Sequence, residues 1–286
     1  MCGITGIFYK DSERRVDEAV LLRMRDTMVH RGPDDQGHFL DGSVGLAHRR
    51  LSIIDLSSGQ QPMTTPDGRY TIVFNGEIYN YQGLRQRLSA QGAECRSTSD
   101  TEVLLQWFVA YGIEGLEKLN GIFAFAVWDR RSRRLVLVRD RMGIKPLYYA
   151  NTRQGLAFAS EIKALFQSDL IAPILNQKAL PEYFVWRQVA GSDNLFQGVE
   201  TLLPGHALTL DSTGVRTRPF WVPSPPKPSE VMRFESAVQE LDTILNTAIQ
   251  GQMMSDVPLG TFCSGGIDSS LVTAIAASAG GRSINT

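Results

Sequence analysis

The chain has 286 residues, of which 43% are hydrophobic and 21% charged, so it can form a large core and two domains. Its net charge of −1 argues against a nucleic-acid-binding or polybasic membrane surface, and the sequence contains neither a secretory signal pattern nor a long apolar run. Cys2, Cys95 and Cys263 are too few and too irregularly spaced for a disulfide framework or a zinc site, so we expect no metal site and a cytoplasmic location.

The chain begins with Met1-Cys2-Gly3, and removal of Met1 ahead of a small residue would make Cys2 the first residue. An α-amine titrates near about 7.7–8.0 and a free thiol near about 8.5, so the amine could act as the base for the thiol of the same residue. The apolar residues that follow predict a strand that holds this terminus in place. A cysteine at position 2 can also be accidental, so this interpretation needs partners further along the chain.

Hydrophobic spacing predicts helices over 16–30, 81–91, 100–111, 161–167 and 177–184. Strands are predicted over 44–48, 70–74, 122–129, 135–139, 147–150 and 156–160. The strand over 70–74 ends at Asn75-Gly76, a pair that is typical of a tight hairpin turn. Because strands and helices occur in separate groups, the first two hundred or so residues indicate an α+β domain with packed sheets.

Prolines between 219 and 228 predict a stiff, extended linker, and a helix over 234–254 follows it. A short strand over 257–263 then leads into Ser264-Gly265-Gly266-Ile267-Asp268-Ser269-Ser270 and a helix through 277. Glycines allow backbone N–H groups to face an anion, hydroxyls add donors, and a helix N-terminus adds positive potential. The loop therefore predicts phosphate binding, although it lacks the Gly-Lys-Ser/Thr ending of a Walker A loop.

The chain resembles the N-terminal part of glutamine-hydrolysing asparagine synthetases, which are class II glutamine amidotransferases with an N-terminal nucleophile. The resemblance is carried, in order along the chain, by residues 1–6, 30–34, 46–54, 74–81, 99–102, 119–129, 139–149, 159–165 and 264–270. It implies a four-layer αββα glutaminase domain over 1–210, a Pro-rich linker over 211–230, and the truncated start of an α/β pyrophosphate-loop ATPase domain over 231–286.

The resemblance also implies the roles of individual residues. Cys2 would attack the side-chain amide of glutamine, and Asn75 with the N–H of Gly76 would form the oxyanion hole. Arg50 would hold the substrate carboxylate and Asp100 its ammonium, within a glutamine-binding set of Arg50, Leu51, Ile53, Asn75, Glu77 and Asp100. ATP or pyrophosphate would be bound by Cys263, Ser264, Gly265, Gly266, Asp268, Ser269 and Ser270.

Several of these residues have simpler interpretations. Arg50 and Asp100 could form surface salt bridges, and Asp100 could merely cap its helix. His30 and His48 fit packing or hydrogen-bonding roles better than catalysis, and Cys95 fits a structural thiol.

The function implied for the intact protein is glutamine-dependent asparagine synthesis. Ammonia released at Cys2 would react with aspartate activated by ATP as an acyl-adenylate. ATP with Mg²⁺ would serve the synthetase half, glutamine hydrolysis would need no cofactor, and a homodimer is possible. Family members continue well beyond residue 286, so we expect this chain to hydrolyse glutamine without making asparagine. Another carboxylate acceptor, a stand-alone glutaminase and a non-catalytic remnant remain alternatives.

Overall fold

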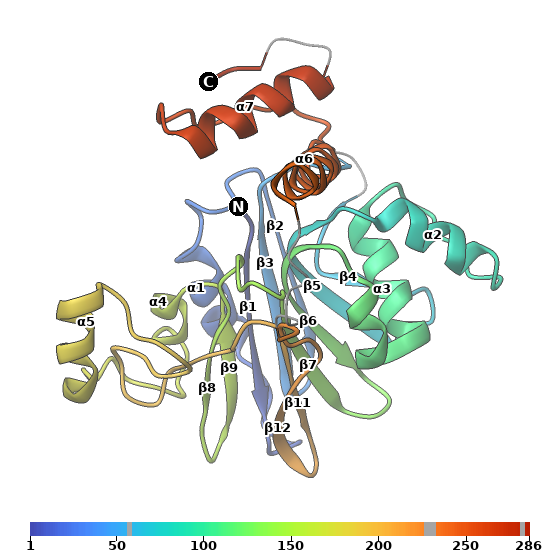
Figure 1. The fold of residues 1–286 in the computed structure, drawn as a ribbon. Helices are drawn as coiled ribbons and strands as arrows, with labels where there is room; N and C mark the ends of the chain where they lie inside the picture. Colours follow the sequence, from blue (N-terminus) through green and yellow to red (C-terminus); the bar gives the residue numbers. More distant parts are fainter. Residues whose placement is uncertain (56–58, 226–232, 281–283) are drawn as a thin grey trace. The chain divides into compact units, whose positions relative to one another are not determined.

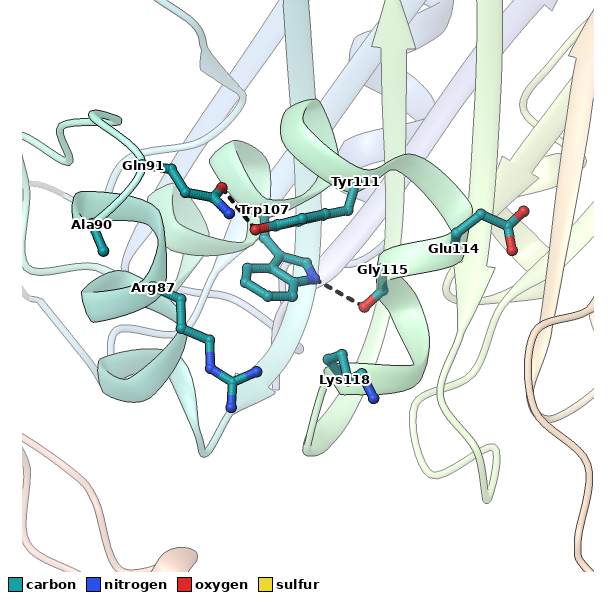
Figure 2. A pocket seen from close by; sticks show the side chains of 8 residues that line it. All are labelled: Arg87, Ala90, Gln91, Trp107, Tyr111, Glu114, Gly115 and Lys118. Carbon is teal, nitrogen blue, oxygen red and sulfur yellow. Dashed lines mark hydrogen bonds between the residues drawn. The ribbon is translucent and has the colours of Figure 1, made fainter.

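The computed structural model describes residues 1–55, 59–225, 233–280 and 284–286. The chain divides into two compact units (Figure 1). The first unit comprises residues 1–52 and 57–222, and the second comprises residues 53–56 and 223–286.

Two six-stranded antiparallel sheets form the centre of the first unit. The first sheet has the order β10-β8-β9-β1-β3-β2. Its strands are β1 (Gly3–Tyr9), β2 (Asp35–Asp41), β3 (Val44–Arg50), β8 (Tyr148–Asn151), β9 (Gly155–Ala159) and β10 (Glu200–Thr201). The second sheet has the order β12-β11-β7-β6-β5-β4. Its strands are β4 (Met63–Thr64), β5 (Tyr70–Ile78), β6 (Gly121–Asp129), β7 (Arg134–Arg139), β11 (His206–Asp211) and β12 (Gly214–Pro219).

Helices cover the outer face of each sheet (Figure 1). The first sheet is covered by α1 (Glu18–Asp26) and α4 (Ile162–Leu165), and the second by α2 (Tyr81–Ser89), α3 (Asp100–Tyr111) and the 3₁₀ helix η1 (Gly112–Lys118). The remaining helices of this unit are η2 (Gln177–Ala179) and α5 (Leu180–Trp186). The predicted four-layer αββα arrangement is therefore confirmed.

A separate hydrophobic cluster fills each interface between layers. The cluster between the two sheets includes Ile4, Leu46, Val73, Trp128 and Leu208, all at most 1% exposed. A second cluster packs α2 and α3 against the second sheet, and a third packs α1 and α4 against the first. Because both faces of each sheet are covered, central strands such as β1 and β9 are buried along their whole length rather than at alternate residues.

Strand β1 lies between β9 and β3, and all seven of its residues are buried. Gly3 lies opposite Arg49 of β3, and Thr5 lies opposite both Ala47 of β3 and Ala159 of β9. A Cβ atom at Gly6 would stand 2.7 Å from the carbonyl oxygen of Gly45, so this position requires glycine. The residue before β1, Cys2, is thus attached to a strand that is fixed from both sides.

Two predicted boundaries in this unit differ from the structure. Strand β5 continues through Asn75-Gly76, because its ladder with β6 pairs Asn75 with Ala124 and Gly76 with Phe123, and no hairpin forms there. Residues 211–222, assigned to the linker from the sequence, belong to the first unit. Strand β12 pairs with β11 across a turn at Asp211–Gly214, so the proline-rich stretch begins later than expected.

The second unit contains α6 (Phe234–Gly251) and α7 (Ile267–Gly280). The segment 257–263, predicted as a strand, does not form a regular strand. Within the parts of the chain that the structure describes, its strand-type pairing is a single parallel bridge from Gly260 to Asn285. Pro226 and Pro228 of the predicted linker lie outside the described residues. None of the helices in the described ranges is long and apolar enough to span a membrane.

Packing between the two sheets makes Leu46, which is fully buried, a position where truncation should be costly. We expect Leu46→Ala to lower the free energy of unfolding by about 2–5 kcal/mol, because it removes buried methyl groups and leaves a cavity. Leu40→Ala on the neighbouring strand, where the leucine is 38% exposed, should cost less than about 1 kcal/mol. Urea unfolding of both variants measures the difference, and equal losses would contradict the assignment of Leu46 to the inter-sheet core.

Candidate active site

The Cys2 thiol lies at the beginning of β1, beside the end of β3. The backbone N–H of Leu51 points at its sulfur at 3.4 Å, and the thiol can donate to the Leu51 carbonyl at 3.6 Å. Burial raises the pKa of the thiol, while the Leu51 backbone, the chain terminus, Arg50 and Lys145 oppose that rise. The thiol is therefore partly desolvated but is faced by groups that favour its anion.

The N-terminal amine adjoins this thiol. In the structure the amine belongs to Met1, and burial lowers its pKa, so the neutral, basic form of an amine is favoured here. The guanidinium of Arg31 donates through Nε to the Cys2 carbonyl at 2.9 Å and through Nη1 to Glu161 at 3.3 Å, which anchors the terminus. Removal of Met1 would place the amine on the same residue as the thiol.

Asn75 and Gly76 lie in the middle of β5. The Asn75 side chain is 1% exposed, and its amide nitrogen has no hydrogen-bond partner among the described residues. Gly76 has φ +154°, and a Cβ atom there would lie 2.1 Å from the Ile122 carbonyl oxygen, so only glycine fits. An unsatisfied buried amide is rare in native structures, because its desolvation goes uncompensated, and it indicates a partner that arrives from outside.

A buried histidine links the strand that carries Asn75 to the strand that pairs with β1. His48 lies in β3 opposite Ile4, and its Nε2 is 3.0 Å from the carbonyl oxygen of Phe74. Burial lowers the His48 pKa to about 4, so the ring is neutral at physiological pH and Nε2 donates to that carbonyl. His48 thus has the hydrogen-bonding role expected of it, and it fixes Asn75 relative to β1.

Glu77 and Asp100 form an acidic pair close to these residues. Asp100 is 5% exposed, and its carboxylate accepts from the backbone N–H of Ile78 at 3.0 Å. Burial, together with the charge of Glu77, raises its pKa to about 6. The N-cap of α3 is Ser99, whose side chain accepts from Thr101, so Asp100 does not serve as that cap.

Arg50 ends β3 and is 5% exposed, which excludes the surface salt bridge considered from the sequence. Leu51 contacts the thiol directly, as described above. Ile53, the remaining predicted glutamine-binding residue, belongs to the second unit. The first unit therefore brings together Cys2, Arg50, Leu51, Asn75, Gly76, Glu77 and Asp100.

Lys145 belongs to the same charged cluster but has no role in the sequence analysis. It lies in the loop after β7, is 8% exposed, and interacts electrostatically with Glu77 and Cys2. The stretch 139–149 carries part of the family resemblance, but that resemblance assigns no role to Lys145. A signal was present, since a lysine flanked by Ile144 and Pro146 just before an apolar strand is an unusual place for a solvated charge.

The glycine-serine loop of the second unit precedes α7. Gly265 has φ +84°, and Ser264 Oγ lies 3.0 Å from Ser269 Oγ. The Cys263 thiol is exposed, and its pKa is lowered by the Gly265 backbone N–H. Exposed N–H and hydroxyl donors at a helix N-terminus fit the phosphates of a nucleotide. No cluster of three potential metal ligands occurs in the ranges that the structure describes.

Two families match this chain: residues 1–221 match the glutamine amidotransferase domain, and residues 240–286 match asparagine synthase. The glutamine-hydrolyzing asparagine synthetase 3 of Bacillus subtilis (strain 168) is 38% identical over 280 residues, covering 97% of this chain and 45% of that protein. Synthetase 1 of the same organism is 39% identical, covering 96% and 44%. The amidase chyE of Penicillium rubens is 35% identical, covering 97% and 43%.

The chain thus spans less than half the length of these curated relatives. Among solved structures, the allosteric regulatory enzyme of purine biosynthesis matches with a TM-score of 0.57 and 18% identity, covering 99% of this chain and 64% of that one. A glutamine phosphoribosylpyrophosphate amidotransferase from Bacillus subtilis matches with 0.54 and 16%, covering 97% and 64%. At such identities the likeness concerns the fold alone.

The buried neutral His48 should make stability depend on pH. Its folded pKa of about 4 lies below the unfolded value of 6.5, so the unfolded state binds the proton first. We expect this residue to remove about 3 kcal/mol of stability as pH falls from about 6.5 to about 4. The variant His48→Gln, which can still donate to the Phe74 carbonyl but does not titrate, should lose less over this window. Urea unfolding at several pH values tests this, and parallel profiles would contradict it.

Proposed function

Because this chain belongs to the glutamine amidotransferase domain family, we propose that it hydrolyses the side-chain amide of glutamine with Cys2 as the nucleophile. The observation that carries the proposal is the buried, unpartnered amide of Asn75 on a strand fixed relative to Cys2. A tetrahedral intermediate of amide hydrolysis needs such a donor, held in advance where negative charge develops.

The reaction proceeds in two halves. With Met1 removed, the α-amine of Cys2 takes the thiol proton, and the thiolate attacks the amide carbon of glutamine. The oxyanion that forms accepts from Asn75 Nδ2 and the N–H of Gly76. Collapse of the intermediate breaks the carbon–nitrogen bond and releases ammonia, whose third hydrogen comes from the protonated amine. Water then attacks the γ-glutamyl thioester and yields glutamate and the free thiol.

Charged groups of the pocket hold the amino-acid end of glutamine in this proposal. Arg50 pairs with the α-carboxylate through its planar guanidinium, and Asp100 with Glu77 binds the α-ammonium. The raised pKa values of both acids support this role, because burial disfavours their charged forms until the ammonium of a substrate pairs with them. Leu51, which contacts the thiol, completes the proposed glutamine-binding set within the first unit.

The match of residues 240–286 to asparagine synthase supports the proposal that the intact protein uses this ammonia for asparagine synthesis. Ser264, Gly265, Gly266, Asp268, Ser269, Ser270 and the adjoining Cys263 would hold the phosphates of ATP, with Mg²⁺ as the counter-ion and aspartate as the acceptor. A homodimer and a cytoplasmic location complete the proposal; three free cysteines fit a reducing compartment.

A second candidate is amide transfer to a different carboxylate. The 35% identity to a fungal protein named as an amidase, over 97% of this chain, favours keeping it. Both candidates share the glutaminase half and differ in the acceptor. Product analysis with ATP, glutamine and a panel of carboxylic acids, on the longest available form of the protein, separates the two candidates. Formation of asparagine from aspartate supports the first. Formation of a different amide, without asparagine, supports the second.

The amine mechanism requires Cys2 to be the first residue. We expect a protein with one non-removable residue before Cys2 to lose at least about 100-fold in glutaminase kcat, because its base becomes a peptide nitrogen. The matched control carries a cleavable extension whose removal exposes Cys2 and should restore activity. Ammonia release and intact mass are measured together, and full turnover with the extension in place would refute the amine as base.

Loss of the oxyanion donor should affect the rate more than binding. We expect Asn75→Ala to lower kcat by about 100-fold or more with a much smaller change in KM, since the amide is needed chiefly when the oxyanion forms. Asn151→Ala, at an exposed position of β8, serves as the control and should leave both constants unchanged. An unaltered kcat in Asn75→Ala would reduce Asn75-Gly76 to a structural element of β5.

Glutamine binding should weaken in acid. The pKa of Asp100 is about 6, so below this pH the carboxyl is neutral in the free enzyme and no longer pairs with the α-ammonium. We expect KM to rise up to about tenfold per pH unit as pH falls below about 6. Asp100→Asn should show a high KM that no longer rises over this range. Initial-rate measurements decide this, and an unchanged pH profile in Asp100→Asn would assign the titration elsewhere.

A further inference from the structure

The loop that carries Lys145 is rigidly built. The carboxylate of Asp140 accepts from four backbone N–H groups at 2.9–3.1 Å, those of Phe123, Met142, Ile144 and Lys145. The guanidinium of Arg139 donates to the carbonyl oxygens of Gly143, Lys145 and Leu202 at 2.7–2.9 Å. Both the N–H and the C=O of Lys145 are therefore held, and the direction of its side chain is set by the loop.

This loop reverses the usual distribution of side chains. Met142 and Ile144 are 71% and 56% exposed, whereas Lys145 between Ile144 and Pro146 is only 8% exposed. Lysine is almost never buried without a partner, because the desolvated ammonium loses its hydration. Within the described parts of the chain its ammonium makes no ion pair or hydrogen bond. The loop thus exposes two apolar side chains, Met142 and Ile144, and encloses the lysine that follows them.

The register of the second sheet places Lys145 beside the site. The Asp140 carboxylate that holds the N–H of Lys145 also holds the N–H of Phe123, which lies opposite Gly76 of β5. The charged and titratable groups that act on its ammonium are Glu77, Cys2, Arg31 and Asp140, in that order. Those that act on the thiol are the chain-terminal amine, Arg50 and Lys145. Glu77 in turn is influenced by Lys145, which opposes the rise of its pKa on burial. Lys145 is thus the cation that the nucleophile and the substrate-binding acid share.

We propose that Lys145 is a positioning residue of the glutaminase site, whose buried ammonium stabilises the thiolate of Cys2 and keeps Glu77 ionised for the substrate. The proposal rests on the function proposed above. Arg50 is committed to the substrate carboxylate in that proposal, so it cannot also balance the thiolate once glutamine is bound. Lys145 remains available to stabilise the thiolate throughout the acylation step, because that step transfers no proton to or from its ammonium.

The test compares Lys145→Met, which keeps length and removes charge, with Lys145→Arg, which restores charge. The rate of Cys2 alkylation by iodoacetamide is followed against pH, with peptide mass spectrometry to separate Cys2 from Cys95 and Cys263. Lys145→Met should move the midpoint upward by about one pH unit and lower kcat about tenfold or more, and Lys145→Arg should restore both. Lys178→Met, at an exposed position, is the control and should behave as the unmodified protein.

An unchanged midpoint in Lys145→Met, or equal effects of Met and Arg, would overturn the proposal and leave Lys145 a packing residue. Because alkylation does not need glutamine turnover, a chain without glutaminase activity would refute the proposed function while the thiol titration still decides the role of Lys145.

A reciprocal measurement uses the unmodified protein and covers the case in which Lys145→Met does not fold. Coupling between two sites is mutual, so converting Cys2 to its neutral carbamidomethyl thioether should lower the titration midpoint of the Lys145 ammonium by a similar amount. Nitrogen-15 NMR of the lysine side chains before and after alkylation measures this shift. A Lys145 midpoint that does not change on alkylation would contradict the proposed coupling.

Discussion

One constraint governs the proposed site: a thiol that uses the amine of its own residue must stand at the beginning of the chain and still be held rigidly. Chain ends normally fray, because few contacts oppose their conformational entropy. Here the terminus leads directly into β1, which is paired on both sides by β3 and β9 and buried along its whole length. The anchoring of Cys2 by Arg31 and Leu51 extends this order to the residue before the strand.

The two-sheet arrangement then supplies the rest of the site. Strand β3 carries Arg50 and lies in the same sheet as β1, whereas Asn75 and Glu77 are carried by β5 in the other sheet. The hydrogen bond from His48 to the Phe74 carbonyl crosses between the sheets and sets their relative position beside the thiol. A neutral, buried histidine suits this task, since a charged ring would carry the cost of desolvation without a counter-ion.

Sequence reasoning reached the elements whose signals are local. The layered fold followed from the grouping of strands and helices together with the resemblance, and residues 1–221 and 240–286 match the two families that the resemblance implies. The proposed roles of Cys2, Asn75, Gly76 and Asp100 come from the resemblance, and the geometry of these residues supports the proposal.

Features set by distant partners were beyond that reasoning. Asn75-Gly76 resembles a hairpin turn, yet pairing with β6 draws it into a strand, because tertiary hydrogen bonds outweigh turn propensity. The segment 257–263 has the composition of a strand, but a strand also needs neighbours, and one bridge to Asn285 does not make a ladder. The apolar neighbours of Lys145 in the sequence indicate an unusual lysine, but its burial follows from the hydrogen bonds of Asp140 and Arg139 to the surrounding backbone, which the sequence does not reveal.

The central claim is that Cys2, with its own amine exposed, forms a covalent bond to the γ-carbonyl of glutamine. Rapid acid quenching of the protein during turnover, followed by digestion and mass spectrometry, tests it most directly. The account predicts a glutamine-dependent γ-glutamyl thioester on the peptide that begins at Cys2, with Met1 absent and with at least one ammonia released for each adduct formed. Ammonia release without an acyl adduct, or with the adduct on a different residue, would contradict it.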